Sequence, residues 1–512
     1  MKTAAFWRIL ALILAVLCVI PLAAACGSPN TPDTGKETAA PGKETSGGET
    51  RSEPKETEAE TVWYTADQPE GLSLTKPDGT PKEFNFLAFS ADDSMYWHDT
   101  DFTSEAMTGD TIGDAVYERH KYVEEENGIL LTIHHAGVNC EYNTLVNSVS
   151  AGDDDFQAAY LNTQGSFTVA TMECLAELNE LGTIQLDAPW WDQNCLSDLS
   201  ILGQNYALYG DFGVMYRKTL AIVSFNKKIL SEKLPNAENL YELQATKQWT
   251  VAKMADLVTS VSEDLNGDGE MTDGDLYGLT YQGDVMPIAI ISCGIRFVTK
   301  NDDDIPVFSF NTDRTLDAMD LLADLLYDTD CARSSSANPP NITNHGQLFQ
   351  NGGSLFDAGE VHSVINHRAM ENDFGVLCMP LFDENQDNYY TCINPHVAAT
   401  LVVPNSVKDP AFVGYMLDAL AAAGKNYLEP AFYDKTLQGK SVRDEDSRAT
   451  LDIIFAHIRY DLGYLSNWGI SELMRGLVDS RSLDFSSRYR SEESSFQSRL
   501  DQTIRAFEAL AG

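Results

Sequence analysis

The sequence predicts an α/β protein with more than one hydrophobic core. At 512 residues the chain exceeds the length that one core usually supports, which favours two domains. Short apolar runs alternate with amphipathic helical patterns in both halves, and this alternation is typical of βαβ units with largely parallel sheets. An acidic, glycine-rich loop near the middle of the chain is the third feature that guides the interpretation.

The chain begins with a pattern typical of an exported lipoprotein. Lys2 and Arg8 precede an apolar run over residues 9–20, and small residues precede Cys26. We therefore expect residues 1–26 to be a lipoprotein signal peptide, with Cys26 as the lipid-modified first residue of the mature protein. The alternative is ordinary secretion with a free Cys26.

Residues 27–61 have almost no large apolar side chains, so they cannot bury a core, and we expect a flexible linker. The folded part should then cover residues 62–512. Together with the lipid, the linker would hold this part at the outer face of the cytoplasmic membrane.

The first half of the folded part supplies strands and helices in alternation. The expected elements are a strand over residues 84–89, a polar loop over 90–101, a helix over 110–127, a strand over 129–133, a helix up to 151 and a strand over 156–161. Ligands of parallel sheets lie beyond the carboxyl ends of the strands. Asn162 and Gln164 follow such an end and are candidates for ligand binding on position alone.

The second half repeats the mixture. Met254, Leu257 and Val261 mark an amphipathic helix, and further segments are expected as a helix over residues 316–326, a strand over 401–403, a helix over 413–420 and a mainly helical end over 448–512.

The mid-chain loop matches the calcium-binding loop of EF-hand proteins in residue order. With Asp264 as position one, oxygen donors occupy positions one, three, five, seven, nine and twelve, and these are Asp264, Asn266, Asp268, Glu270, Thr272 and Asp275. Glu270 contributes its carbonyl, and Gly269 stands at position six, where the turn is sharp. We expect a structural Ca²⁺ site, and the alternative is an empty acidic turn.

The formal charge of −42 argues against nucleic acid and anionic lipid as partners, because both need clustered Lys and Arg. The catalytic patterns GxSxG, HExxH and GxGxxG do not occur in the sequence. His362 and His367 are five residues apart, a poor spacing for metal ligands, so we expect both to be structural. We expect no enzymatic activity.

Seven cysteines follow Cys26, and their odd number and irregular spacing support neither a full disulfide framework nor a zinc site. We expect mostly buried thiols. Cys378 and Cys392 are the first pair to test for a bridge.

Several segments together resemble the family 1 extracellular solute-binding proteins, the maltose-binding-like ABC-transporter receptors common in clostridial bacteria. They are Trp249-Thr250, the Asp264 loop, Tyr277-Gly278-Leu279, Pro189-Trp190-Trp191-Asp192, Phe225-Asn226-Lys227 and Phe374-Gly375-Val376-Leu377. The likeness spans about residues 84–470, and the order of the segments carries it. It implies the two-lobe, type II periplasmic-binding-protein-like fold, with a ligand cleft between lobes joined by crossover segments.

The resemblance also implies a function: a lipoprotein that captures a solute, here expected to be a carbohydrate, and delivers it to ABC-transporter permease subunits. Sugars need flat rings to pack on and polar groups at the rim. The candidate ligand-binding residues are Asn162, Gln164, Trp190, Trp191, Asp192, Tyr389, Tyr390 and Trp468. Two alternatives remain, a secreted carbohydrate-active enzyme with a calcium-binding loop and a solute-sensing lipoprotein without a transport partner.

Overall fold

A computed structural model describes residues 62–92, 97–137, 141–328, 330–334, 345–482 and 484–510. Its contacts divide the chain into residues 1–61 and residues 62–512. The expected signal peptide, Cys26 and the linker lie outside the described residues. Within the described ranges, no helix has both the length and the apolar character needed to cross a bilayer.

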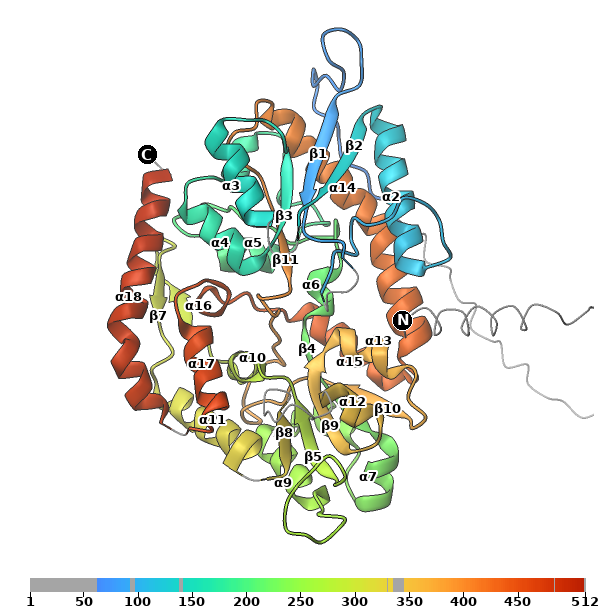
Figure 1. Ribbon diagram of the computed structural model, residues 1–512, viewed down its shortest axis with the longest axis vertical. Coiled ribbons are helices and arrows are strands. Elements are labelled where there is room, and N and C mark those ends of the chain that lie inside the picture. The colour runs from blue at the N-terminus through green and yellow to red at the C-terminus, as the bar shows by residue number, and fades with distance from the viewer. Residues whose placement is uncertain are drawn as a thin grey trace, which may run out of the picture. The chain divides into compact units, whose positions relative to one another are not determined.

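The first lobe is built on a four-stranded sheet in the order β11-β3-β1-β2 (Figure 1). Its strands are β1 (Glu83–Ala88), β2 (Leu130–His135), β3 (Ala158–Asn162) and β11 (Ala399–Val402). Strands β1, β2 and β3 are parallel, as expected of βαβ units, and β11 is antiparallel to β3.

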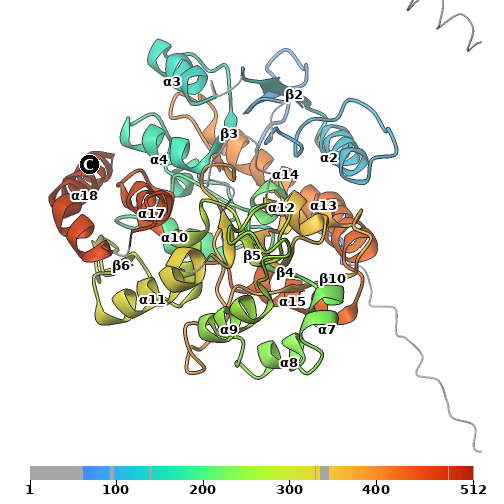
Figure 2. The same cartoon turned by 60° about the horizontal axis from the view of Figure 1, so that its bottom comes forward.

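The helices of the first lobe include α2 (Thr111–Asn127), α3 (Glu141–Ala151), α4 (Thr163–Thr171), η1 (Leu178–Leu181), α5 (Gln193–Leu199) and α14 (Pro410–Pro430). Asp110 caps α2, because its carboxylate accepts the Gly113 N–H, and Gly128 ends the helix at φ 60°. Glycine adopts this left-handed conformation without a steric penalty. Helices α2 and α14 pack against each other (Figure 2).

The second lobe is built on a five-stranded sheet in the order β10-β4-β9-β5-β8. Its strands are β4 (Ala221–Asn226), β5 (Tyr277–Tyr281), β8 (Ala332–Ser334), β9 (Ser354–Glu360) and β10 (Phe374–Leu377). Strand β5 is parallel to β8 and β9, whereas β4 is antiparallel to both of its neighbours. Each lobe therefore contains one strand that reverses the direction of its sheet.

The rest of the second lobe is mainly helical. The elements around the second sheet are α7 (Lys227–Lys233), α8 (Leu240–Ala245), α9 (Val251–Val261), α10 (Val285–Ser292), the hairpin β6 (Val298–Lys300) and β7 (Pro306–Phe308), α11 (Asp313–Ala323), η2 (Asp324–Asp328), α12 (His345–Gln350), α13 (Val361–His367) and α15 (Glu445–Ala456). The chain ends with α16 (Leu462–Leu465), α17 (Ile470–Asp479) and α18 (Phe485–Leu510). Helix α18 contacts α4 of the first lobe as well as α11 and α17.

Three segments cross between the lobes. The first runs from β3 to β4 through α6 (Met215–Lys218), and the second runs from β10 back to β11. The third leads from α14, which packs on α2, through the π-helical segment η3 (Ala431–Ser441) to α15, which packs on β10. The predicted type II arrangement of two α/β lobes joined by crossover segments is confirmed.

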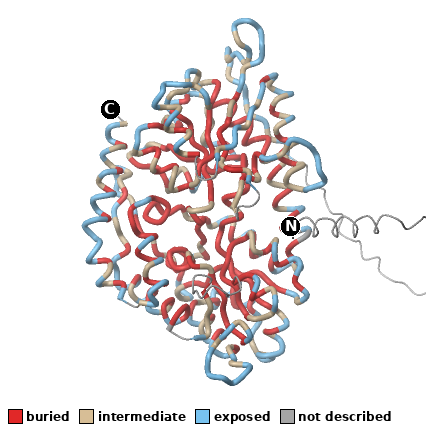
Figure 3. The backbone as a smooth tube through the Cα atoms, in the orientation of Figure 1, coloured by how far each residue is buried: buried red, intermediate tan, exposed pale blue. Residues whose placement is uncertain are grey.

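Both faces of β3, an inner strand of the first sheet, are buried. In β3, Ala158 and Tyr160 belong to the core beneath α14, whereas Ala159 and Leu161 face a second core that continues into the rest of the molecule. This alternation follows from the two-residue period of a strand. The buried stretches of backbone follow the strands of both sheets in Figure 3.

The described cysteines are free thiols, and most of them are buried, as expected. The suggested bridge between Cys378 and Cys392 is wrong. Both are free thiols buried in the core, and burial raises the pKa of each. They behave as small core residues.

Trp190 and Trp191 share one acceptor on α14. Their indole N–H groups both donate to Oδ1 of Asp418, at 2.9 and 2.8 Å, and the other carboxylate oxygen accepts the backbone N–H of Gln185 at 2.8 Å. Asp418 is fully buried, and burial raises its pKa. One carboxylate therefore fastens the loop that carries both indoles to α14.

Replacing Asp418 by alanine would leave two buried indole donors and one half-buried backbone donor without this acceptor. Each such donor costs about 1–3 kcal/mol, and because the effects are not additive we expect Asp418→Ala to lower the free energy of unfolding by about 2–4 kcal/mol. Urea unfolding followed by circular dichroism measures this change. Asp256→Ala, on the exposed face of α9, removes the same charge and should lower the free energy of unfolding by only about 0.5 kcal/mol or less. Equal effects of the two substitutions would contradict the assigned role of Asp418.

Candidate functional site

A cavity of about 490 Å³ lies between the two lobes. The first lobe contributes the segment after β1 and the start of α2, the second lobe contributes α13, and the crossover helix α6 contributes Lys218. Strands β1 and β9 both end at this place, so the cavity occupies the carboxyl edge at which α/β proteins bind ligands. Its volume falls in the range typical of small-molecule sites.

Asp101 fixes the segment after β1 against the crossover. Its Oδ2 accepts three hydrogen bonds of 2.9 Å, from the Tyr160 hydroxyl and from the N–H groups of Val214 and Met215. A Cβ atom on Gly213 would lie 2.5 Å from this oxygen, so only glycine fits there. The wall of the cavity is thus attached to the start of α6.

Lys218 lies at the other end of α6 and faces this wall. Its ammonium donates to the Thr100 hydroxyl at 2.7 Å, and the residue is only 8% exposed. Burial lowers the pKa of Lys218, although Asp101 and Asp99 oppose the shift. Burial, assisted by Asp101, raises the pKa of Asp99 to about 7.

His362, in the first turn of α13, reaches the cavity from the second lobe. Its ring lies 5.0 Å from the ring of Trp97, which comes from the segment after β1. Burial lowers the pKa of His362 to about 4, and Lys218 and His98 add to the effect. The side chain of His362 lines the cavity, and its expected structural role stays a prediction. His367 does have a structural place, buried 3.4 Å from a carboxylate oxygen of Asp357.

Glu360 lies two residues before His362, at the end of β9, and forms a hydrogen-bonded cluster of polar side chains. The Glu360 carboxylate accepts hydrogen bonds of 3.0 Å from the side-chain amides of Gln282, which follows β5, and Asn394, which lies in the second crossover. Burial raises the pKa of Glu360 to about 7. Near neutral pH this carboxyl therefore exchanges readily between its proton-donating and proton-accepting forms.

An ion pair continues this cluster. Arg475 on α17 donates to Asp284, and the shortest of these contacts is 2.6 Å. The same guanidinium lies 3.1 Å from Nε2 of His396, which is also 3.2 Å from the Ser471 hydroxyl. The carboxyl ends of β5 and β9 are thus followed by side chains that offer both donors and acceptors.

Two of the residues predicted for ligand binding lie at the carboxyl end of β3. Asn162 caps α4, with Oδ1 accepting the Gly165 N–H at 2.7 Å, and its amide donates to Glu141 at 3.4 Å. The buried side-chain nitrogen of Gln164 has no hydrogen-bond partner among the described residues. This free donor agrees with the expected role of Gln164, which stays a prediction.

Asp192 and the two adjacent indoles lie inside the first lobe. Trp190 and Trp191 are 5% and 3% exposed and use their N–H groups on Asp418. Asp192 caps α5 and accepts the Tyr460 hydroxyl at 2.8 Å. These contacts give all three residues a packing role, and their contact with a solute stays a prediction.

The remaining predicted aromatics lie in separate places. Tyr389 is buried and donates to the carbonyl of Gln244, and Tyr390 donates to Asp387 at 2.6 Å. Trp468 is buried against α18, where it donates to the Thr503 hydroxyl. The structure does not bring the predicted aromatics together.

The residues that line the interlobe cavity are not among the predicted binding residues, because each stands alone in the sequence. His98, Lys218 and His362 are separated by more than a hundred residues, so no short motif contains two of them. The one available signal was positional: residues just after a predicted strand lie at the ligand edge. Applied to the loop over residues 90–101, that rule points to Trp97 and His98.

The Asp264 loop adopts a tight turn in which side-chain oxygens accept backbone N–H groups. Asp264 accepts from Gly267 and Gly269, at 2.7 and 2.8 Å, and Asp275 accepts from Thr272 at 2.8 Å. This bond from Thr272 is the main cause that lowers the pKa of Asp275. Across the described part of the chain, no group of three or more His, Cys, Asp or Glu side chains converges as a metal site. Calcium binding stays a prediction.

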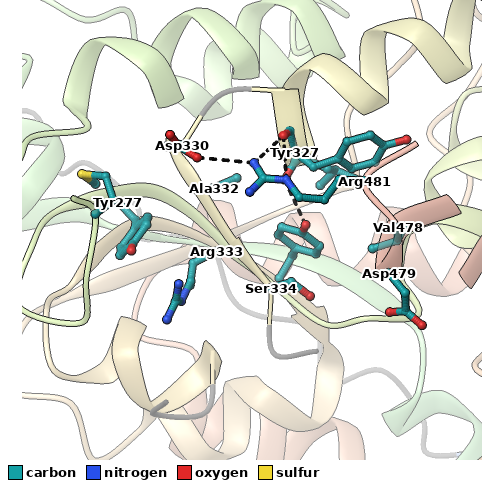
Figure 4. Close-up of a pocket in the computed structure, with 12 residues that line it drawn as sticks. Tyr277, Tyr327, Asp330, Ala332, Arg333, Ser334, Val478, Asp479 and Arg481 are labelled. Atoms are coloured by element: carbon teal, nitrogen blue, oxygen red, sulfur yellow. Dashed lines mark hydrogen bonds and ion pairs between the residues drawn. The ribbon is translucent and has the colours of Figure 1, made fainter. Parts of the chain in front are cut away.

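A second, smaller cavity of about 140 Å³ lies at the edge of the second sheet (Figure 4). Figure 4 shows Arg481 reaching toward Asp330 and the carbonyl of Tyr327, while Tyr277 and Arg333 lie on another side. Its volume is below the range typical of ligand sites. The interlobe cavity is therefore the better candidate site.

No protein-family model matches the chain, and no curated protein matches its sequence. Solved structures do share its fold. The sugar-binding protein MalE from Xanthomonas citri is 13% identical with a TM-score of 0.57, covering 84% of this chain and 99% of its own. UgpB from Mycobacterium tuberculosis, in complex with glycerophosphocholine, is 14% identical with a TM-score of 0.54, covering 78% and 98%.

An ABC substrate-binding protein from Listeria monocytogenes, in complex with cycloalternan, is 14% identical with a TM-score of 0.53, covering 82% of this chain and 99% of its own. At these identities the likeness establishes the fold, which is that of two-lobe substrate-binding proteins.

Proposed function

We propose that the protein captures a carbohydrate between its two lobes and delivers it, unchanged, to the permease of an ABC transporter. The interlobe cavity carries this proposal, because both lobes and a crossover helix contribute to its wall. Closure of the lobes would then enclose a solute and remove it from water, as in hinged binding proteins.

Side chains that adjoin the lining residue His362 suit a sugar. Trp97 offers a flat ring beside His362, and Glu360, two residues before His362, brings Gln282 and Asn394 as further donors and acceptors for hydroxyl groups. Similar folds bind carbohydrates in the MalE and cycloalternan-bound proteins named above, which supports the choice of solute class.

The proposal includes the lipid anchor at Cys26, the linker over residues 27–61 and a position on the outer face of the cytoplasmic membrane. The export pattern and the composition of the linker support it. A single acyl chain binds a membrane only marginally, so a stable anchor requires more than one.

The proposal is tested by scanning fluorimetry with a panel of neutral and acidic oligosaccharides. A bound solute should raise the melting temperature in a concentration-dependent way, and chromatography of the mixture should show no new product. Trp97→Ala should weaken the response about tenfold and leave the melting temperature of the free protein nearly unchanged, because the ring is only half-buried.

Trp190→Ala is the matched comparison. Since its indole is buried, truncation should destabilise the free protein by about 3–5 kcal/mol. If Trp190→Ala instead abolished sugar binding without destabilising the protein, the paired indoles would be the binding platform. Turnover of a sugar would favour the alternative of a secreted enzyme, and stabilisation by amino acids or peptides alone would contradict the carbohydrate assignment.

We also propose that the Asp264 loop binds Ca²⁺ as a structural ion. The order of its oxygen-bearing residues supports this, and so does the repulsion among carboxylates that a cation would relieve. The loop leads directly into β5, whose far end carries Gln282, so an ordered loop would help to hold this strand.

Calcium at a hundred times its dissociation constant would add about 2.7 kcal/mol to stability. Melting curves in calcium and in chelator should therefore differ for the natural protein, and Asp268→Ala should remove the difference while sugar binding persists. Asp256→Ala, outside the loop, should keep the response. An unchanged melting temperature of the natural protein in chelator would show that the loop is an empty turn.

A further inference from the structure

Positively charged and protonatable side chains gather at the interlobe cavity of a strongly acidic chain. The sequence has 35 Lys and Arg against 77 Asp and Glu, so a random surface would be dominated by carboxylates. The cavity instead collects His98, Lys218, His362 and Arg368. These four come from the segment after β1, from α6 and from α13 with the residue that follows it.

Lys218 is the most constrained of the four. It is 8% exposed, and among the described residues its ammonium has one hydrogen-bond partner, the uncharged Thr100 hydroxyl. An ammonium has three donors, and the Thr100 hydroxyl takes one of them. Asp101, Asp99 and Asp110 favour its charged form from a distance, and an anion in the cavity would add a direct acceptor and a closer counter-ion.

The carboxylates at the cavity are already occupied. Asp99 accepts the N–H groups of Asp101 and Phe102, at 2.9 and 3.2 Å, and its raised pKa of about 7 reduces its negative charge. Asp110 caps α2 by accepting the Gly113 N–H at 2.8 Å. The start of α2, a helix of 17 residues, also lines the cavity, and helix N-termini favour anions.

The groups from the two lobes also influence one another. Lys218 and His98 both disfavour the charged form of His362, which faces them from the second lobe, so its ring is uncharged near neutral pH. A negative group held between the lobes would favour protonation of this ring and so add an attraction across the cavity.

We propose that the captured solute carries a carboxylate or phosphate group, and that Lys218, Arg368, His98 and His362 bind this group at the interlobe cavity. This inference rests on the proposed function and narrows the solute class from neutral to acidic carbohydrates. The polar residues around Glu360 would then contact the hydroxyl groups of the same solute.

Matched ligand pairs test the proposal by isothermal titration calorimetry on the whole folded part, residues 62–512. The pairs are oligogalacturonide against neutral galacto-oligosaccharide, and glucose 6-phosphate against glucose, with inorganic phosphate alone as a further arm. The expected result is binding of at least one acidic member with its neutral partner at least about tenfold weaker. The two pairs distinguish a carboxylate from a phosphate.

Lys218→Met keeps the length of the side chain and removes its charge. It should weaken binding of the acidic ligand by about tenfold or more, whereas Lys408→Met, at an exposed position of the first lobe, should have no effect. Arg368 is exposed, so Arg368→Gln should fold normally and provides a second test if Lys218→Met is unstable.

Equal binding of neutral and acidic partners, or acidic binding that neither Lys218→Met nor Arg368→Gln weakens, would overturn the inference and leave the proposed function intact. If neither neutral nor acidic carbohydrates bound, the result would contradict the proposed function as well.

Discussion

The buried carboxylate of Asp101 is the constraint on which the candidate site depends. It accepts the Tyr160 hydroxyl from β3 and two backbone N–H groups at the start of α6. The Arg119 guanidinium from α2 donates to the carbonyls of Asp101 and Phe212 and so braces the same junction. One fully buried group thereby joins the sheet of the first lobe, the cavity wall and the crossover.

This attachment fixes one end of a crossover between the lobes. The crossover through α6 is held at its first-lobe end by Asp101, and it continues into β4, which lies inside the second sheet. Lys218 lies at the end of α6 that leads to β4 and contacts Thr100, so the same short helix positions one wall of the cavity. If the lobes close on a solute as proposed, that equilibrium would shift only through contacts that differ between the open and closed states.

Local patterns predicted the fold well, whereas the residues predicted for ligand binding stay predictions. The helix expected over residues 110–127 is α2, because its cap Asp110 and its terminator Gly128 act within one turn of the helix. Aromatic residues carry no comparable local signal. Trp190 and Trp191 look like a sugar platform, but their acceptor is Asp418, which lies more than two hundred residues away in the chain. His98, Lys218 and His362 likewise meet at the cavity because of the order of the strands in the sheets. That order cannot be read from local sequence patterns.

Hydrogen–deuterium exchange, with and without the carbohydrate that stabilises the protein most, tests the central claim most directly. The claim is that a solute is held between residues 97–113 of the first lobe and residues 361–368 of the second. Protection from exchange should appear in both segments at once, because closure orders the two walls together. Protection confined to residues 189–193 and α14, with both walls unchanged, would contradict this account of the site.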